Sequence, residues 1–153
     1  MLIYIGADHR GFALKENLKP VLKNLGYEVA DVGAAVLTPD DDYPVYAKLV
    51  AEKVSASPAD VRGILICGSG FGVDEAANKF PNVRSALASS PDHAYQARHD
   101  DDANVLAIAA DFINEGIAEK MVKVFLATPF AKEEKYKRRL GEVGEIEDKT
   151  INH

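Results

Sequence analysis

The chain has 153 residues, and 18 lysines and arginines against 24 aspartates and glutamates give it a formal net charge of −6. This length suits one domain, and a hydrophobic fraction of 47% excludes a disordered chain. The acidic balance argues against nucleic acid and anionic membrane surfaces as partners, since both need a cationic face. With no export signal, no apolar run near the roughly 18 residues of a membrane span and a lone cysteine, the sequence predicts a cytoplasmic protein.

Short apolar runs recur along the chain, each followed by a polar or glycine-rich turn and then by a stretch of helical period. Several runs are almost continuously apolar, which is typical of strands buried on both faces of a parallel sheet. The predicted strands are Leu2–Ala7, Tyr27–Val32, Gly63–Cys67, Val83–Ala88 and Asn104–Ala109.

The first two helices are predicted between these runs. Apolar residues from Leu14 to Leu25 share one helical face, and Pro20 among them predicts a kink or a break. A second helix covers Val45–Val54, with Pro44 near its first turn.

Three further helices are predicted in the second half of the chain. Ser90 caps one that runs to about Arg98, and Ile117–Phe125 forms another. A final charged helix starts near Phe130, before an acidic and partly mobile tail from about Gly141.

Strands that alternate with helices predict βαβ units with right-handed crossovers. The expected fold is a three-layer α/β/α Rossmann-like sandwich with about five parallel strands, formed as a single domain over residues 1–153. The order of the strands cannot be derived from the sequence.

Ligands of open α/β sheets bind at the carboxyl ends of the strands, and two of these ends carry unusual residues. The first strand leads into Asp8-His9-Arg10-Gly11, which suits either a polar turn, with Asp8 capping the following helix, or the orientation of sugar hydroxyls or an anion. The third strand leads into the glycine-rich segment Cys67–Gly72.

Cys67 allows two interpretations. A lone cysteine at a strand end can be a small buried hydrophobic residue. Beside a helix N-terminus and a row of glycine N–H groups, the same thiol lies in positive potential, which favours a thiolate that acts as nucleophile or base.

The glycines at 68, 70 and 72 can permit a tight turn, or they can present bare N–H groups that hold a phosphate or an oxyanion. Ser69 adds a hydroxyl to the same loop. The spacing is not the six-residue dinucleotide fingerprint, and no fitting acidic residue follows on a second strand, so a nucleotide cofactor is disfavoured.

Two charged clusters lie later in the chain. Arg98–Asn104 contains three consecutive aspartates, which form either a solvated helix end or a divalent metal site. Consecutive side chains point in different directions and no second ligand group is spaced to match, so no metal is expected. Lys135 and Arg139 are four residues apart on the last helix and form either a solubilising face or an anion clamp.

Several segments match the motifs of one known family in order, at about the same spacing and over nearly the whole chain. They are Asp8-His9-x-Gly11-Phe12-x-Leu14-Lys15, Asp42-Tyr43-Pro44, Ile66-Cys67-Gly68-Ser69-Gly70-x-Gly72, Ala76-Ala77-Asn78-Lys79, Asn104-Val105-Leu106 and Pro129-Phe130. The sequence thereby resembles the ribose-5-phosphate isomerase B and galactose-6-phosphate isomerase family.

The resemblance implies aldose–ketose isomerisation through a cis-enediolate, without a cofactor, in a homodimer or homotetramer whose active sites are shared between subunits. Cys67 matches the base that moves a proton between C1 and C2 of the sugar, and Ser69 matches a hydroxyl that assists ring opening. The implied substrate-binding positions in the first half of the chain are Asp8, His9, Tyr43, Gly68, Gly70, Phe71 and Gly72.

The sequence departs from the family where a His-Asn pair is usual, because Asp100 and Asp101 stand there and the nearest imidazole is His99. We expect His99 or Asp100 to act in ring opening and Asp101 in substrate binding. Because these residues precede the fifth strand, they would lie at the edge of a parallel sheet opposite to Cys67, and a second chain would have to supply them.

The phosphate end also departs from the family. A family arginine falls at Asp111, and the first arginine of the terminal Arg-His-x-x-Arg motif is Lys135, which leaves Lys135 and Arg139 as the expected contacts. Loss of an arginine weakens bidentate recognition of a phosphate. Arg10, where the family often has a small residue, is expected to supply a replacement charge.

The sequence therefore predicts a sugar-phosphate isomerase, with ribose 5-phosphate as the default substrate. An isomerase of another sugar, phosphorylated or free, remains an alternative. A non-catalytic sugar-phosphate-binding subunit of a hetero-oligomer is the alternative outside enzymes.

Overall fold

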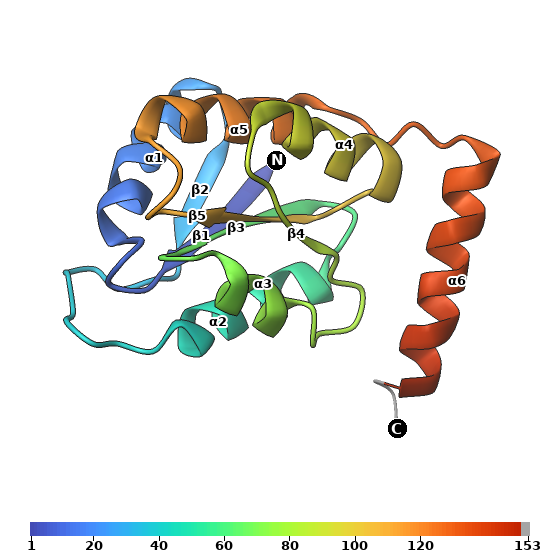
Figure 1. Cartoon of the computed structure of the whole chain (residues 1–153), viewed down its shortest axis with the longest axis horizontal. Helices are drawn as coiled ribbons and strands as arrows, with labels where there is room; N and C mark the ends of the chain where they lie inside the picture. The colour runs from blue at the N-terminus through green and yellow to red at the C-terminus, as the bar shows by residue number, and fades with distance from the viewer. Residues whose placement is uncertain (151–153) are drawn as a thin grey trace.

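The computed structural model describes residues 1–150 as a parallel five-stranded sheet between two layers of helices, as predicted (Figure 1). The strand order is β2-β1-β3-β5-β4, and every neighbouring pair is parallel. The strands are β1 (Leu2–Ala7), β2 (Glu28–Asp31), β3 (Val61–Cys67), β4 (Ser85–Leu87) and β5 (Val105–Ala109). The edge strands β2 and β4 are shorter than predicted, because each has a single neighbour to extend its hydrogen-bonded ladder.

The helices divide between the two faces of the sheet (Figure 1). They are α1 (Phe12–Asn24), α2 (Tyr43–Ala56), α3 (Phe71–Ala77), α4 (Pro91–Asp101), α5 (Glu115–Ala127) and α6 (Glu134–Thr150). α1, α4 and α5 cover one face and share one apolar core with the sheet, whereas α2 and α3 cover the other face and share a second core. No helix among residues 1–150 is long and apolar enough to cross a bilayer.

Pro20 does not break α1, which runs unbroken from Phe12 to Asn24. Leu18 and Leu22 are fully buried on one side of this helix, while Pro20 is exposed on another. The carbonyl group that loses its N–H partner to the proline can therefore bond to water, while the buried leucines hold the helix against the sheet.

The C-terminal region differs from the prediction in two ways. The last helix begins at Glu134 rather than near Phe130, and it continues through Gly141 to Thr150 instead of ending in a mobile tail. Leu140, Val143 and Ile146 lie three residues apart and line a cavity of about 470 Å³ beside α4. This apolar stripe explains why the acidic segment is helical; residues 151–153 lie outside the described residues.

α6 stands away from the rest of the molecule (Figure 1). None of its residues within Glu134–Thr150 is buried, and Val143 and Ile146 are 51% and 63% exposed. A helix with an exposed apolar stripe is only partly packed by its own chain.

Candidate active site

Two loops meet at the carboxyl-terminal edge of the sheet. β1 and β3 are neighbours in register, with Ala7 opposite Ile66, and the Asp8 N–H donates to the Ile66 carbonyl at 3.3 Å. A Cβ atom on Gly11 would lie 2.6 Å from the same carbonyl oxygen, so only glycine lets the two loops approach this closely. The fold therefore brings Asp8–Arg10 beside the segment that begins at Cys67.

Cys67 is the last residue of β3 and is 4% exposed. The N–H of Gly70 donates to its Sγ at 3.2 Å. Gly70 has φ of +75°, a conformation that glycine adopts without strain, and this conformation turns its N–H back toward the sulfur. This hydrogen bond fixes the sulfur against the glycine loop.

The other loop residues lead from Cys67 into α3. The hydroxyl of Ser69 accepts from the N–H of Phe71 at 3.4 Å, and the Phe71 side chain is 69% exposed. Tyr43, at the start of α2, lies against Gly72 so closely that a Cβ atom there would be 2.5 Å from the tyrosine ring. The structure thus places Tyr43 beside the glycine loop.

Asp8 forms the turn that follows β1. Its Oδ1 accepts from the N–H groups of Arg10 and Gly11, at 3.0 and 3.1 Å, and the residue is 5% exposed. The prediction of a polar turn is therefore confirmed, but Asp8 does not cap the following helix, whose N-cap is Gly11 without a side-chain bond. A role of Asp8 toward a substrate stays a prediction.

His9 is held by Asp41, a residue that the sequence did not single out. Asp41 Oδ1 accepts from the backbone N–H of His9 at 2.7 Å and lies 2.9 Å from its Nδ1. Tyr46 donates to the other carboxylate oxygen at 2.9 Å. The hydrogen bond to Asp41, together with the charges of Asp8 and Asp41, raises the pKa of His9, although burial opposes the shift.

The β2–α2 loop that carries Asp41 is anchored by a buried lysine. Lys15 is fully buried and donates to Asp31 at 2.5 Å and to the Ala34 carbonyl at 2.9 Å. Burial acts to raise the pKa of Asp31, but the bonds from Lys15 and Lys19 outweigh it and lower the pKa. No periodic pattern marks this loop; three adjacent aspartates before Tyr43 were the one available signal for Asp41.

Arg10 and Asp111 form an ion pair across the site. The Arg10 guanidinium lies over Gly68, and the Asp111 N–H donates to the Gly68 carbonyl at 3.0 Å. Both side chains are partly exposed, at 52% and 37%. Arg10 therefore balances the negative charge of Asp111. In this pairing, Arg10 is already engaged and does not stand free as the replacement charge for a phosphate.

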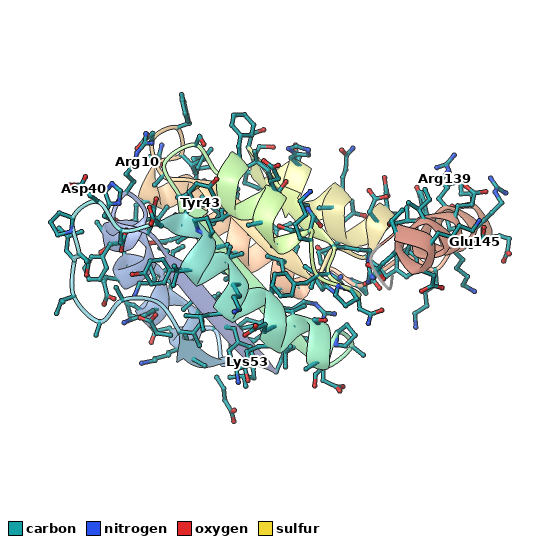
Figure 2. All side chains as sticks on the ribbon, turned by 90° about the horizontal axis from the view of Figure 1, so that it is seen from below. Arg10, Asp40, Tyr43, Lys53, Arg139 and Glu145 are labelled. Carbon is teal, nitrogen blue, oxygen red and sulfur yellow. The ribbon has the colours of Figure 1, made fainter. Side chains whose placement is uncertain are left out.

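The remaining expected site residues form a second group away from Cys67, which consists of His99, Asp100, Asp101, Lys135 and Arg139. His99, Asp100 and Asp101 end α4, before the start of β5, whereas Cys67 pairs with Ala109 at the end of that strand. The two ends of β5 are about 13 Å apart at the usual rise of a strand. Figure 2 shows Arg10 and Tyr43 at one end of the molecule and Arg139, on the projecting α6, at the other.

This second group has its own structure. His99 stacks on Tyr95, with ring centroids 5.0 Å apart, and its Nδ1 lies 2.7 Å from Asp100. That contact, aided by Tyr136 and Lys135, lowers the pKa of Asp100 against the effect of burial. Among residues 1–150, no group of three or more histidine, cysteine or carboxylate side chains is arranged to hold a metal ion.

Comparison with known proteins agrees with this geometry. Residues 3–143 match the family model described as ribose/galactose isomerase. Ribose-5-phosphate isomerase B of Mycobacterium tuberculosis (strain H37Rv) is 37% identical over 147 residues, which cover 96% of this chain and 90% of that protein.

Solved structures give the same result. The crystal structure of ribose-5-phosphate isomerase B from Mycoplasma genitalium, with bound ribulose-5-phosphate, has a TM-score of 0.94 at 38% identity and covers 97% of both chains. The enzyme from Clostridium thermocellum has a TM-score of 0.92 at 39% identity, covering 97% of this chain and 99% of its own.

These relatives identify the chain as an enzyme of the aldose–ketose isomerase class, an intramolecular oxidoreductase. The chain belongs to the ribose/galactose isomerase family.

Proposed function

We propose that this protein is a sugar-phosphate isomerase that interconverts ribose 5-phosphate and ribulose 5-phosphate. The observation that carries the proposal is the buried thiol of Cys67, with the Gly70 N–H at 3.2 Å from its sulfur, at the mouth of a glycine loop. The relative from Mycoplasma genitalium, 38% identical, was solved with ribulose-5-phosphate bound.

In the proposed reaction Cys67 is the base. The proton on C2 of the open aldose is a very weak acid, so its removal needs a base together with stabilisation of the charge that develops on the carbonyl oxygen. The Cys67 thiolate takes the C2 proton, and the C–H electron pair forms the C1–C2 double bond of a cis-enediolate. A proton then passes from the hydroxyl on C2 to the oxygen on C1, and the thiol returns its own proton to C1. The product is a ketone at C2 with a hydroxyl on C1, and no cofactor is needed.

The glycine loop stabilises the intermediate in this mechanism. The Gly70 N–H donates to the sulfur, and the β3–α3 turn holds the other backbone N–H groups of Gly68–Gly72 in the same loop. Donors fixed in advance cost no reorganisation when the negative charge forms, and they act most strongly where water is excluded. Ser69 supplies a hydroxyl next to them for the proton transfers of ring opening.

At the phosphate end, His9 is the cation that the site of a single chain supplies. Asp41 favours the imidazolium form of His9 and fixes its Nδ1, which leaves Nε2 to donate to a phosphate oxygen. Arg10 can bind the phosphate only if its guanidinium contacts Asp111 and the phosphate together, or if its ion pair with Asp111 breaks.

The remaining residues come, in this proposal, from a second copy of the chain. A homodimer or homotetramer would place His99 or Asp100 of one copy beside the sugar ring held by another, and Lys135 and Arg139 beside its phosphate. Two exposed aromatic side chains at the glycine-loop edge, Phe71 at 69% and Phe112 at 78% exposure, support a covering partner there. In a dimer with two-fold symmetry, each contact would occur twice, once in each direction between the copies.

One alternative substrate class has an observation in its favour. The ion pair between Arg10 and Asp111 neutralises both charges where a phosphate contact is expected, which would suit a sugar without phosphate at that position. A non-catalytic role within a hetero-oligomer is less well supported, because Cys67 and its hydrogen bond to Gly70 are intact.

The deciding experiment is an isomerase assay with the purified protein alone, across aldoses with and without a terminal phosphate. Turnover of ribose 5-phosphate at a kcat/KM well above that of ribose supports the proposal. A preference for a free sugar would mean that the substrate is that sugar and not ribose 5-phosphate. Absence of turnover on every aldose, while the protein still binds a sugar phosphate, would favour the non-catalytic role.

A further inference from the structure

A cavity of about 490 Å³ lies at the amino-terminal edge of the sheet, far from the glycine loop. It is bounded by the turn before β3, the end of α4 and the segment after α5. Arg62, Arg98 and Lys132 line it together with a single acidic side chain, Asp102. Leu126, Pro129 and Phe130 form its apolar wall.

The guanidinium of Arg98 is built into the wall of this cavity. The residue is 5% exposed, and its Nη1 donates to Asp102 at 2.7 Å and to the Ala103 carbonyl at 2.6 Å. Asp102 also accepts from Arg84 at 3.0 Å. One carboxylate thus balances two guanidinium groups, which leaves excess positive charge at the cavity.

Arg62 adds to that excess. Its Nη1 donates to the carbonyl groups of Pro58, Ala59 and Val61, at 3.3, 3.4 and 2.8 Å. Within residues 1–150, no carboxylate forms an ion pair with it. Burial lowers the pKa of Arg62, and nearby Arg98 and Arg84 lower it further, whereas Asp102 and Asp60 act in the opposite direction.

Lys132 is the third cation, and its backbone is strained. It has φ of +59°, in the left-handed region that side chains other than those of Asn and Asp seldom adopt. Its side chain is exposed at the cavity, and no ion pair to it occurs in the described part of the chain. A glycine would adopt this conformation without strain, so the backbone conformation does not explain why a lysine stands here.

We propose that this cavity is a second anion site, which binds the phosphoryl group of a small phosphorylated metabolite. Three cations converge on it, two of them held by hydrogen bonds to carbonyl groups, and planar guanidinium groups match phosphate oxygens. The apolar wall would receive the carbon skeleton, in a volume that is usual for small ligands. The site lies at the other edge of the sheet from Cys67 and does not depend on the proposed isomerase activity.

The test is a titration of the full-length, ¹⁵N-labelled protein with phenyl phosphate, followed by amide chemical shifts. Binding at the cavity should shift the amides of residues 58–62 and 128–132, whereas binding at the glycine loop should shift those of residues 8–10 and 67–72. The two sets report separately, so failure of the proposed function leaves the cavity result intact. Unchanged amides at 58–62 and 128–132 up to millimolar phenyl phosphate would overturn the inference.

Two variants sharpen this experiment. Lys132→Gly should leave the melting temperature unchanged or higher, because it relieves the left-handed strain, and yet weaken binding at the cavity about tenfold. Arg62→Met should weaken it similarly, while the shifts at the glycine loop persist. Lys53→Met, an exposed lysine on α2 (Figure 2), is the charge-matched control and should change neither. Equal affinity in Lys132→Gly, Arg62→Met and the control would contradict the site.

Discussion

The two groups of expected site residues differ in how they are held. Asp8, His9 and Cys67 follow central strands that are buried on both faces, so the sheet itself brings them together. His99 and Asp100 are half-buried at the end of α4, and Arg139 lies on a helix with no buried residue. In the proposed mechanism, a single chain supplies the residues for proton transfer, and a second chain would supply the others.

The largest expected effect concerns Cys67 in the first group. Cys67→Ala should lower kcat by about 10²–10⁴-fold, because it removes the proposed base. Exchange of the C2 proton of the substrate with deuterated water, followed by NMR, should stop in parallel. The free energy of unfolding should fall by only about 1 kcal/mol, since the side chain is small.

Asp74→Asn is the matched control for this prediction. Asp74 lies on α3, the helix after the glycine loop; burial raises its pKa, and Ser85 donates to it at 2.7 Å. Its substitution should preserve proton exchange. Near-normal turnover by Cys67→Ala would make Cys67 structural, and Asp74 or Glu75 would then be the next base to examine.

The second prediction tests whether the two groups join across chains. When each variant is assayed by itself, Cys67→Ala and Arg139→Ala should both isomerise a sugar phosphate poorly. Unfolding and refolding them together as an equal mixture should restore about a quarter of the wild-type activity, since half of the dimers are mixed and each has one intact site. A monomer in solution with full specific activity would rule out the shared site.

Sequence reasoning was most accurate where burial determines the structure. Continuous apolar runs located β1, β3 and β5, and the strand ends then identified the two loops that meet at Cys67. It was least accurate for Asp41 and for the C-terminal helix. Asp41 lies in an irregular loop positioned by the buried Lys15, and a long-range contact of this kind leaves no periodic pattern.

The C-terminal region shows a different limit. Its charged composition and its two glycines suggested a tail, whereas the helix depends on three apolar residues whose partners lie on other elements. Likewise, the charges of Arg10 and Asp111 were visible in the sequence, but their pairing required the ends of β1 and β5 to be placed in space.

A third prediction addresses that pair. Asp111→Ala should lower the KM for ribose 5-phosphate by about tenfold, because it frees the Arg10 guanidinium, while the KM for ribose should stay constant. Arg10→Ala should raise the KM for the phosphate, and the double variant should show that the two effects are not additive. Equal effects on both sugars would mean that no phosphate contacts this pair.

The smallest expected effect is the pH dependence set by His9 and Asp41. Asp41 raises the pKa of His9, so the imidazolium persists to a higher pH than in a free histidine, and its contribution to phosphate binding and to stability is lost as the pH rises through that raised value. Asp41→Asn should therefore move the rise in KM for the sugar phosphate to lower pH, with kcat at low pH little changed. Tyr46→Phe removes a hydrogen bond that stabilises the Asp41 carboxylate, so Asp41 becomes a stronger acceptor for His9 and the shift should be smaller and in the opposite direction. NMR titration of the His9 imidazole checks the pKa directly, whatever the substrate proves to be. An identical titration curve in Asp41→Asn would show that Asp41 anchors the loop without tuning His9.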